Sequence, residues 1–243
     1  MSFETHKSSQ SAAESFGYKG NGEAADMVRW ALDRFHPRIA IASSLEDSVL
    51  IHMAASIRKD VRVFSLDTGR LPEETYECAE AIEERLGIHI EWYFPRHEAV
   101  EKLEREKGVY SFRKSLDNRR ECCFIRKIEP LTRALKGLDA WITGMRRDES
   151  VTRETLEKFT IDTAHDGILK LNPLADWTSE DMRAYVRKHR LPYNRLRDQG
   201  YPSIGCVCCT RAVAPGEDPR SGRWWWEQPE HKECGLHVKN WSI

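Results

Sequence analysis

Short apolar runs alternate with longer amphipathic stretches along the chain. The run at residues 38–42 (Arg-Ile-Ala-Ile-Ala) is typical of a buried strand, whereas the charged stretch at residues 97–107, which stops at Gly108, predicts a helix. The expected strands are residues 38–42, 61–66, 89–94 and 140–143. The expected helices are residues 25–35, 49–55, 73–86, 97–107 and 178–188, the last capped by Thr178. This order favours an α/β fold in which helices flank a parallel twisted sheet.

The ends of the chain differ in composition from its middle. Residues 1–24 are rich in Ser, Gly, Ala and Glu, which predicts a flexible leader. We expect one α/β domain over residues 25–210 and a mobile C-terminal tail over residues 211–243. A length of 243 residues fits one domain with a small appendage. The sequence contains no internal repeat.

Charge and hydropathy limit the classes of partner. The net charge of −1 gives no overall attraction to nucleic acid or to an anionic membrane, so any basic binding site must be local. No apolar run approaches the length that spans a membrane, and the first residues lack a signal-peptide core. We therefore expect a cytoplasmic protein with neither nucleic-acid nor membrane partners, and we expect it to form a homo-oligomer. Seven cysteines in that compartment indicate metal or redox chemistry before structural disulfides.

Three polar loops follow expected strands, at residues 43–48, 67–70 and 144–148. Ligands of open α/β sheets bind beyond the carboxyl ends of the strands, so these loops are candidate binding segments. The first loop (Ser-Ser-Leu-Glu-Asp-Ser) opens a helix and could hold an anion, although it lacks the glycines of a phosphate-binding loop and also fits a plain capped turn. Arg146 and Arg147 could pair with phosphate or sulfate, or could lie on a solvated turn.

Four cysteines form two pairs that are far apart in sequence, Cys122-Cys123 and Cys206-x-x-Cys209. Adjacent residues on a helix diverge by about 100°, so a direct Cys-Cys pair needs a large target or a distorted turn. An iron–sulfur cluster spreads its ligand positions and suits such a pair better than a single zinc ion. Buried cysteines without a ligand are the alternative. Nearby cations could offset an anionic centre or bind an anionic substrate; they are Arg119, Arg120, Arg126 and Lys127.

Two further cysteines need separate interpretations. Because of Cys208, two choices exist for the second cysteine pair. The spacing favours Cys206 with Cys209, but Cys208 with Cys209 is also possible, since the first pair is itself adjacent in sequence. Cys234 stands apart in a polar tail, with cations nearby that would lower its pKa and raise its thiolate fraction. The sequence therefore suggests that one set of thiols binds and another thiol reacts, with a buried C-terminal cysteine as the alternative.

Six ordered motifs between about residues 38 and 238 resemble those of assimilatory adenylyl-sulfate (APS) reductases. They are Glu-Cys-Cys-Phe-Ile-Arg-Lys-Ile-Glu-Pro-Leu at residues 121–131, Thr-Gly-Met-Arg-Arg-Asp at 143–148, Leu-Asn-Pro-Leu-Ala-Asp-Trp at 171–177, Tyr-Pro-Ser-Ile-Gly-Cys at 201–206, Gly-Glu-Asp-Pro-Arg-Ser-Gly-Arg-Trp-Trp-Trp-Glu at 216–227 and Lys-Glu-Cys-Gly-Leu-His at 232–237. The resemblance implies an adenine nucleotide alpha hydrolase-like fold of the PP-loop type.

The resemblance also implies a site and a reaction. Cys122, Cys123, Cys206 and Cys209 would bind one 4Fe–4S cluster. Cys234 would attack the sulfur of APS to form an S-sulfocysteine, and Lys127 and His237 are further catalytic candidates. Substrate-binding candidates are Ser43, Ser44, Asp67, Thr68, Arg146, Arg147, Arg220 and Arg223. Thioredoxin would release sulfite, acting in trans because no fused redox domain is expected after Ile243.

The sequence departs from the family pattern at two places, and two other functions compete with APS reduction as interpretations. The loop at residues 43–48 is short and lacks the usual glycine, and Cys208 stands where the family usually has another residue. One rival is a reductase for the 3′-phosphorylated substrate (PAPS), or for both substrates; the presence of both cysteine pairs favours APS. The other rival is a zinc-stabilised nucleotide-binding regulator without turnover.

Overall fold

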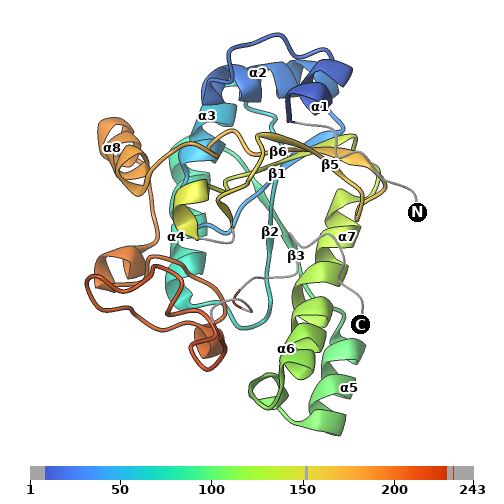
Figure 1. The fold of residues 1–243 in the computed structure, drawn as a ribbon, viewed down its shortest axis with the longest axis vertical. Coiled ribbons are helices and arrows are strands. Elements are labelled where there is room, and N and C mark those ends of the chain that lie inside the picture. The colour runs from blue at the N-terminus through green and yellow to red at the C-terminus, as the bar shows by residue number, and fades with distance from the viewer. Residues whose placement is uncertain (1–8, 151–152, 229–231, 233–243) are drawn as a thin grey trace.

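The computed structural model describes residues 9–150, 153–228 and 232, and its centre is a six-stranded sheet (Figure 1). The strand order is β3-β2-β1-β4-β6-β5, and every neighbouring pair is parallel except β5 with β6. The strands are β1 Ile39–Ala42, β2 Val63–Leu66, β3 Ile90–Tyr93, β4 Ala140–Thr143, β5 Phe159–Asp162 and β6 Ile168–Leu171. Because β1 lies between β2 and β4, the chain changes direction across the sheet at β1, which is where open α/β sheets place their ligands.

The side chains of each strand alternate between two apolar layers. In β1, Ile39 and Ile41 pack in the larger core and Ala40 packs in the smaller one. In β4, Ile142 faces the larger core and Trp141 the smaller one. This alternation of period two buries both faces, which a mostly parallel sheet requires.

Helices cover both faces of the sheet. The α-helices are α1 Ser9–Ser15, α2 Ala24–Phe35, α3 Val49–Ile57, α4 Glu73–Leu86, α5 His97–Lys107, α6 Leu116–Cys123, α7 Glu129–Leu135 and α8 Ser179–His189. Apolar residues of α2, α3 and α4 fill the larger core, and those of α7 fill the smaller one. None of the helices within the described residues has the length and apolar character needed to cross a membrane.

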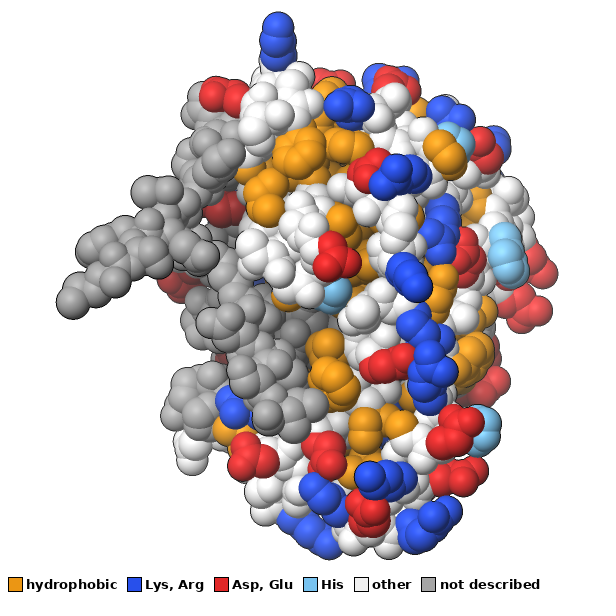
Figure 2. All heavy atoms as spheres, turned by 90° about the vertical axis from the view of Figure 1, so that its right-hand side faces the viewer, with side chains coloured by type: hydrophobic (Ala, Val, Ile, Leu, Met, Phe, Trp, Pro, Cys, Tyr) orange, Lys and Arg blue, Asp and Glu red, His pale blue; other side chains and the backbone are white. Residues whose placement is uncertain are grey.

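The helices α5, α6 and α7 lie together on one side of the molecule (Figure 1). The face drawn in Figure 2 carries Lys and Arg side chains with Asp and Glu side chains beside them. Glu129 of α7 pairs with Arg133 on the same helix and with Arg96, which precedes α5, at N–O distances of 2.8 and 3.0 Å. Exposed pairs of this kind add little stability, but they balance the charge of a strongly charged surface.

The predicted α/β architecture is confirmed, and most element boundaries agree closely. Helices α4 and α5 and strand β4 have the predicted bounds, and the other predicted elements begin or end within about two residues of them. The predicted parallel sheet has one antiparallel edge, where β5 and β6 form a hairpin that the sequence did not reveal. In β5, only Phe159 is buried, so the strand lacks the continuous apolar run that marks the central strands.

The flexible leader predicted for residues 1–24 is wrong for residues 9–24. Helix α1 lies there, and Ala12 and Ala13 are buried in the larger core. Tyr18 packs its ring at 4.9 Å from Phe159 of β5 and at 5.2 Å from Trp30 of α2, measured between ring centroids. Small and aromatic side chains therefore attach this polar segment to the edge of the sheet.

The described part of the expected tail, residues 211–228, packs against the domain. The amide of Trp224 donates to the carbonyl of Cys209 in the domain at 3.0 Å, and within the segment the amide of Arg211 donates to the carbonyl of Gly222 at 3.0 Å. Trp224 itself is almost completely buried. This segment therefore closes over the second cysteine pair.

Candidate functional site

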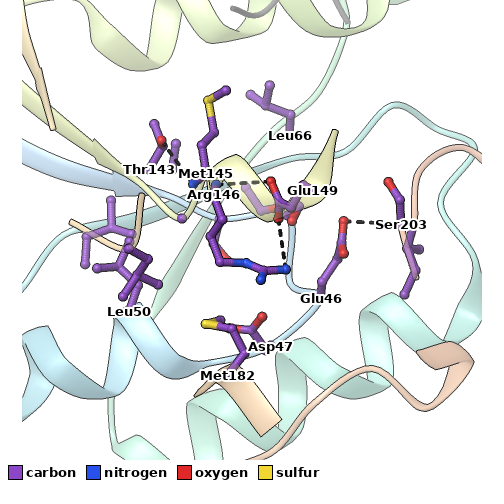
Figure 3. A pocket seen from close by; sticks show the side chains of 18 of the residues that line it. Glu46, Asp47, Leu50, Leu66, Thr143, Met145, Arg146, Glu149, Met182 and Ser203 are labelled. Atoms are coloured by element: carbon purple, nitrogen blue, oxygen red, sulfur yellow. Dashed lines mark hydrogen bonds and ion pairs between the residues drawn. The ribbon is translucent and has the colours of Figure 1, made fainter. Parts of the chain in front are cut away.

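A cavity of about 270 Å³ opens beyond the carboxyl ends of β1, β2 and β4. Its polar wall includes the loop that follows β1, with Ser43, Ser44, Glu46 and Asp47, and its apolar wall includes residues such as Leu50 and Met182. Figure 3 shows the Arg146 side chain between these walls, with Glu46, Asp47 and Glu149 around it. The volume is near the lower end of the range of about 300–1,000 Å³ for small-molecule sites. A polar wall beside an apolar one suits a ligand with a flat apolar ring and an anionic group.

Arg146 is fixed by carboxylates at the edge of this cavity. Its guanidinium lies 3.5 Å from Asp148 and 3.5 Å from Glu149, and the side chain is almost fully buried. Asp148 also accepts hydrogen bonds from the amide and hydroxyl of Ser179 at 2.7 and 2.8 Å, at the start of α8. The positive charge of Arg146 is therefore matched by its own neighbours.

Two carboxyl groups in the loop after β1, those of Glu46 and Asp47, lie in surroundings that disfavour their charged form. Burial raises the pKa of Glu46 and of Asp47, and the attraction of Arg197 offsets this only in part. Glu46 lies 3.3 Å from the Arg197 guanidinium and accepts from the amide of Ile204 at 3.3 Å. Asp47 accepts from the amide of Val49 at 3.1 Å, the first residue of α3.

The two cysteine pairs meet at a second, small cavity of about 20 Å³. Cys122, Cys123, Cys206 and Cys209 all line it, together with Cys208. The first pair ends α6, and a π-helical turn at Phe124–Ile128 follows it directly before α7. The pair itself lies in regular α-helix, and the distortion begins at the next residue, so the expectation that the pair needs a large target or a distorted turn stays a prediction. The two pairs therefore line the same cavity, although Cys122 and Cys206 are 84 positions apart in sequence.

The two cavities share a wall. Lys127, from the π-helical turn, and Arg223 line both of them. Thr68 adds a third link, because it lines the larger cavity while its hydroxyl accepts a hydrogen bond from the Cys206 thiol at 3.2 Å. A ligand in the larger cavity would thus lie within one layer of side chains of the cysteines.

Cations and N–H donors surround the cysteine cavity. Among its lining residues, Arg126, Arg223 and Trp224 each have a buried Nε or Nε1 atom without a hydrogen-bond partner. Buried donors are normally satisfied, so their gathering here fits an anionic, sulfur-rich group. Within the described residues, no three His, Cys, Asp or Glu side chains are arranged to hold a single metal ion. The four cysteines line one small cavity.

Cys208 lies at the edge of this cavity and is more exposed than the other four thiols. Its sulfur is 3.8 Å from that of Cys209 and 3.9 Å from Nη1 of Arg70. The hydrogen bond with Cys209 and the attraction of Arg70 lower the pKa of the Cys208 thiol to about 6. The same interaction with Cys208, together with burial, raises the pKa of Cys209.

The structure gathers most, but not all, of the predicted site residues. The larger cavity is lined by Ser43, Ser44, Thr68, Lys127, Arg146, Arg220 and Arg223. Asp67 and Arg147 are not among its lining residues. Asp67 instead accepts from Gly69 and Tyr76 at 2.7 and 2.9 Å, and Arg147 pairs with Asp176. Cys234 and His237 lie outside the described residues.

Several lining residues had not been predicted. Glu149 and Arg153 pair with each other at the cavity, and Ser203 reaches it from the segment before Cys206. The four-residue spacing of Glu149 and Arg153 was a usable signal for such a pair. For Ser203 the sequence offered none, because its position depends on how the segment between α8 and Cys206 folds back.

Known proteins resemble this chain over most of its length. The phosphoadenosine phosphosulfate reductase domain model matches residues 36–212. An adenosine 5′-phosphosulfate reductase of Allochromatium vinosum is 50% identical over 206 residues, which are 84% of this chain and 80% of that protein. One of Burkholderia cepacia is 47% identical over 218 residues, 89% of this chain and 87% of that protein. The crystal structure of a phosphoadenylyl-sulfate (PAPS) reductase from Candida auris, in a phosphate complex, has a TM-score of 0.65 at 26% identity and covers 79% of this chain and 90% of that one.

The half-buried Glu46 gives a pH-dependent prediction. Its folded-state pKa is raised, so the cost of burying its charge is present above that pKa and disappears below the ordinary value, where the carboxyl is protonated in both states. Glu46→Gln should therefore raise the melting temperature at pH 7, and the gain should shrink as the pH falls to about 4.

Thermal unfolding from about pH 4 to about pH 8 measures this effect. The matched control is Glu180→Gln, because the hydrogen bonds of Arg187 and Arg183 lower the pKa of the exposed Glu180 carboxyl. The control should show no gain at neutral pH. A Glu46→Gln variant no more stable than wild type at pH 7 would contradict the prediction.

Proposed function

The chain belongs to the phosphoadenosine phosphosulfate reductase family, and on that premise we propose that it is an APS reductase of sulfate assimilation and cysteine biosynthesis. The enzyme would convert adenylyl sulfate to sulfite and AMP in the cytoplasm, with thioredoxin as reductant. The names of the two relatives near 50% identity support APS as the substrate. The chain spans 80% or more of each of those proteins.

The observation that carries the proposal is the shared wall between the two cavities. The larger cavity has the position of a nucleotide site, at the carboxyl ends of parallel strands. The smaller cavity has the thiols. Lys127 and Arg223 line both, so an anionic group between the cavities would meet two cations at once.

The proposed substrate fits the charges of the larger cavity. Lys127, Arg220 and Arg223 would bind the phosphosulfate, because a thiolate that attacks an anionic substrate needs cations to offset the repulsion. Ser43, Ser44 and Thr68 would contact the nucleotide from the loops that follow β1 and β2. Arg146 would order the opposite wall through its carboxylate partners.

The reaction would proceed in two steps that balance. The Cys234 thiolate attacks the sulfur of APS, an S–S bond forms, the S–O bond to the phosphate breaks, and AMP leaves. A thioredoxin thiol then attacks the Cys234 sulfur, sulfite leaves with the electron pair, and a mixed disulfide forms. The second thioredoxin thiol attacks this mixed disulfide, which closes the thioredoxin disulfide and releases the Cys234 thiol, so two electrons pass from the dithiol. The potential of thioredoxin, about −270 mV, suits this reduction. Lys127 and His237 are the proposed supporting groups.

The hydrogen bonds of Lys232 support the approach of Cys234 to the substrate. Lys232 precedes Cys234 by two positions, and its carbonyl accepts hydrogen bonds from Nη2 and Nε of Arg220 at 3.0 and 3.3 Å. Its ammonium group donates to the carbonyl of Ser221 at 3.2 Å. The backbone near the nucleophile is thus attached to an arginine of the substrate cavity.

We propose Cys122, Cys123, Cys206 and Cys209 as the ligands of a 4Fe–4S cluster. The buried donors around the cavity fit such a group, and a cube presents its ligand positions over several ångströms, as a set of thiols that line one small cavity requires. When bound, the cluster would supply an anionic centre that acts electrostatically and structurally. Cys208 remains the alternative to one of the ligands in the second pair.

A PAPS or dual-specificity reductase is the second candidate. The PAPS reductase of Candida auris favours it, since that structure matches the fold and 79% of the chain. Its identity is 26%, against 50% and 47% for the proteins named as APS reductases. The closer relatives therefore favour APS.

Substrate preference gives the first test. We expect kcat/KM for APS to exceed that for PAPS by at least about tenfold, which corresponds to about 1.4 kcal/mol of transition-state discrimination. Steady-state sulfite release with thioredoxin measures both values. Equal values would indicate a dual enzyme, and a preference for PAPS would refute the assignment.

Metal content gives the second test. Anaerobic purification should yield a brown protein with about four irons per chain. Iron, acid-labile sulfide and zinc are measured on the same sample. Replacing Cys122 by Ser should remove the iron, whereas replacing Cys78, which lies buried in helix α4, should not. Colourless protein that carries zinc would instead support a regulator without turnover.

The nucleophile gives the third test. Cys234→Ser should release no sulfite yet bind AMP with wild-type affinity, because the nucleotide cavity does not depend on its thiol. Mass spectrometry of wild-type protein after exposure to APS without reductant should detect a sulfonate on Cys234. Full activity of the variant, or an adduct on another cysteine, would remove Cys234 from the mechanism.

A further inference from the structure

Trp224 lines the cysteine cavity and packs against two arginines. The guanidinium carbon of Arg119 is 4.7 Å from the centre of its ring, and that of Arg223 is also 4.7 Å away. The indole is 1% exposed. In a desolvated site, an aromatic face attracts such a cation strongly. The three side chains therefore form a contiguous stack, with Trp224 in the middle.

One end of the stack is fixed by a buried ion pair. Nε of Arg119 donates to Oε1 of Glu227 at 3.0 Å, and Nη2 donates to Oε2 at 3.0 Å. The side chains are only 2% and 8% exposed. This two-bond fork gives Arg119 one orientation, and it joins helix α6 to a segment 108 residues away in sequence.

The other end of the stack is Arg223, which lines the substrate cavity. Its Nη1 donates to the hydroxyl of Ser203 at 3.2 Å and to the carbonyl of Ile204 at 3.2 Å. A Cβ atom at Gly205 would lie 2.3 Å from Nη2 of Arg223, so the backbone approaches the guanidinium as closely as glycine allows. The position of Arg223 is thus set by backbone on one side and by Trp224 on the other.

We propose that Arg119 and Glu227 are positioning residues for substrate binding, which hold Trp224 and, through it, the anion-binding guanidinium of Arg223. The role rests on the proposed function only for the identity of the anion, a phosphosulfate or a nucleotide phosphate. Neither residue lines the larger cavity, so neither contacts the ligand there. Their effect is transmitted through the indole.

Arg119→Lys tests this role, because lysine keeps the charge but not the planar fork. We expect KM for APS to rise about tenfold, with kcat within about threefold of wild type, as for a loss of uniform binding. We expect the dissociation constant for AMP, measured by calorimetry, to rise by a similar factor. Iron per chain is measured on each sample, so that an effect on the cysteine cavity is seen separately.

Glu227→Gln is the second variant, because it keeps the shape of the side chain and removes the charge. Like Arg119→Lys, this variant should bind AMP more weakly than the wild type. The double exchange Arg119→Glu with Glu227→Arg should restore part of the AMP affinity. The matched control is Arg187→Lys, which alters an exposed pair with Glu180 on α8 and should leave AMP binding unchanged.

The outcomes separate the two proposals. Unchanged AMP affinity in folded Arg119→Lys and Glu227→Gln would overturn the positioning role, as would a loss of iron without a loss of affinity. If circular dichroism shows that both variants fail to fold, the pair is structural and the role is likewise overturned. Failure of the wild-type protein to reduce APS would refute the proposed function alone, because AMP binding is measured independently of turnover.

Discussion

Buried positive charge is the constraint on which the site depends. Five arginines at the two cavities are almost fully buried, namely Arg119, Arg126, Arg146, Arg220 and Arg223. A guanidinium cannot lose its charge, so burial requires a partner for each one. Glu227 supplies it for Arg119, Glu104 for Arg126, and Asp148 with Glu149 for Arg146. Arg220 donates to the carbonyl of Lys232, and Arg223 donates to a hydroxyl and a carbonyl. Both guanidinium groups also lie near the ring of Trp224, and Arg223 and Glu46 attract each other.

The partners come from distant parts of the chain, and this ties the cavities together. Glu104 on α5 accepts from both Arg70 and Arg126 at 2.8 and 2.7 Å, which joins the loop after β2 to the π-helical turn. Arg126 also donates to the carbonyl of Thr68 at 2.7 Å. Because breaking one buried pair leaves a charge without compensation, these segments stabilise one another. The loop after β2 and the π-helical turn that follows the first cysteine pair are consequently held together.

The spacing of apolar residues predicted the central strands and helices, because each of these elements has one clear local sequence pattern. The apolar runs before Ser43, Asp67 and Gly144 marked the strands, and their loops proved to line one cavity at Ser43, Thr68 and Arg146. The sequence alone could not show which of the two arginines, Arg146 or Arg147, lines the cavity. Arg146 is extended and Arg147 begins a 3₁₀ turn, so the two side chains diverge, one to the cavity and one to Asp176. Contacts such as Arg119 with Glu227 depend on tertiary folding over more than 100 residues and leave no local pattern.

The loop after β1 shows how the chain tolerates the absence of a glycine. Leu45 has a φ of 57°, in the left-handed region, where a residue other than glycine costs roughly 1–2 kcal/mol. Its side chain is completely buried in the larger core, and burying a leucine contributes about 1.5–3 kcal/mol. Burial therefore offsets the backbone strain. The amide of Leu45 then donates to Ser43 at 3.1 Å, so the loop keeps a tight turn between β1 and α3. What a glycine would supply by conformational freedom, this chain supplies by packing, which makes the shape of the loop depend on the core beneath it.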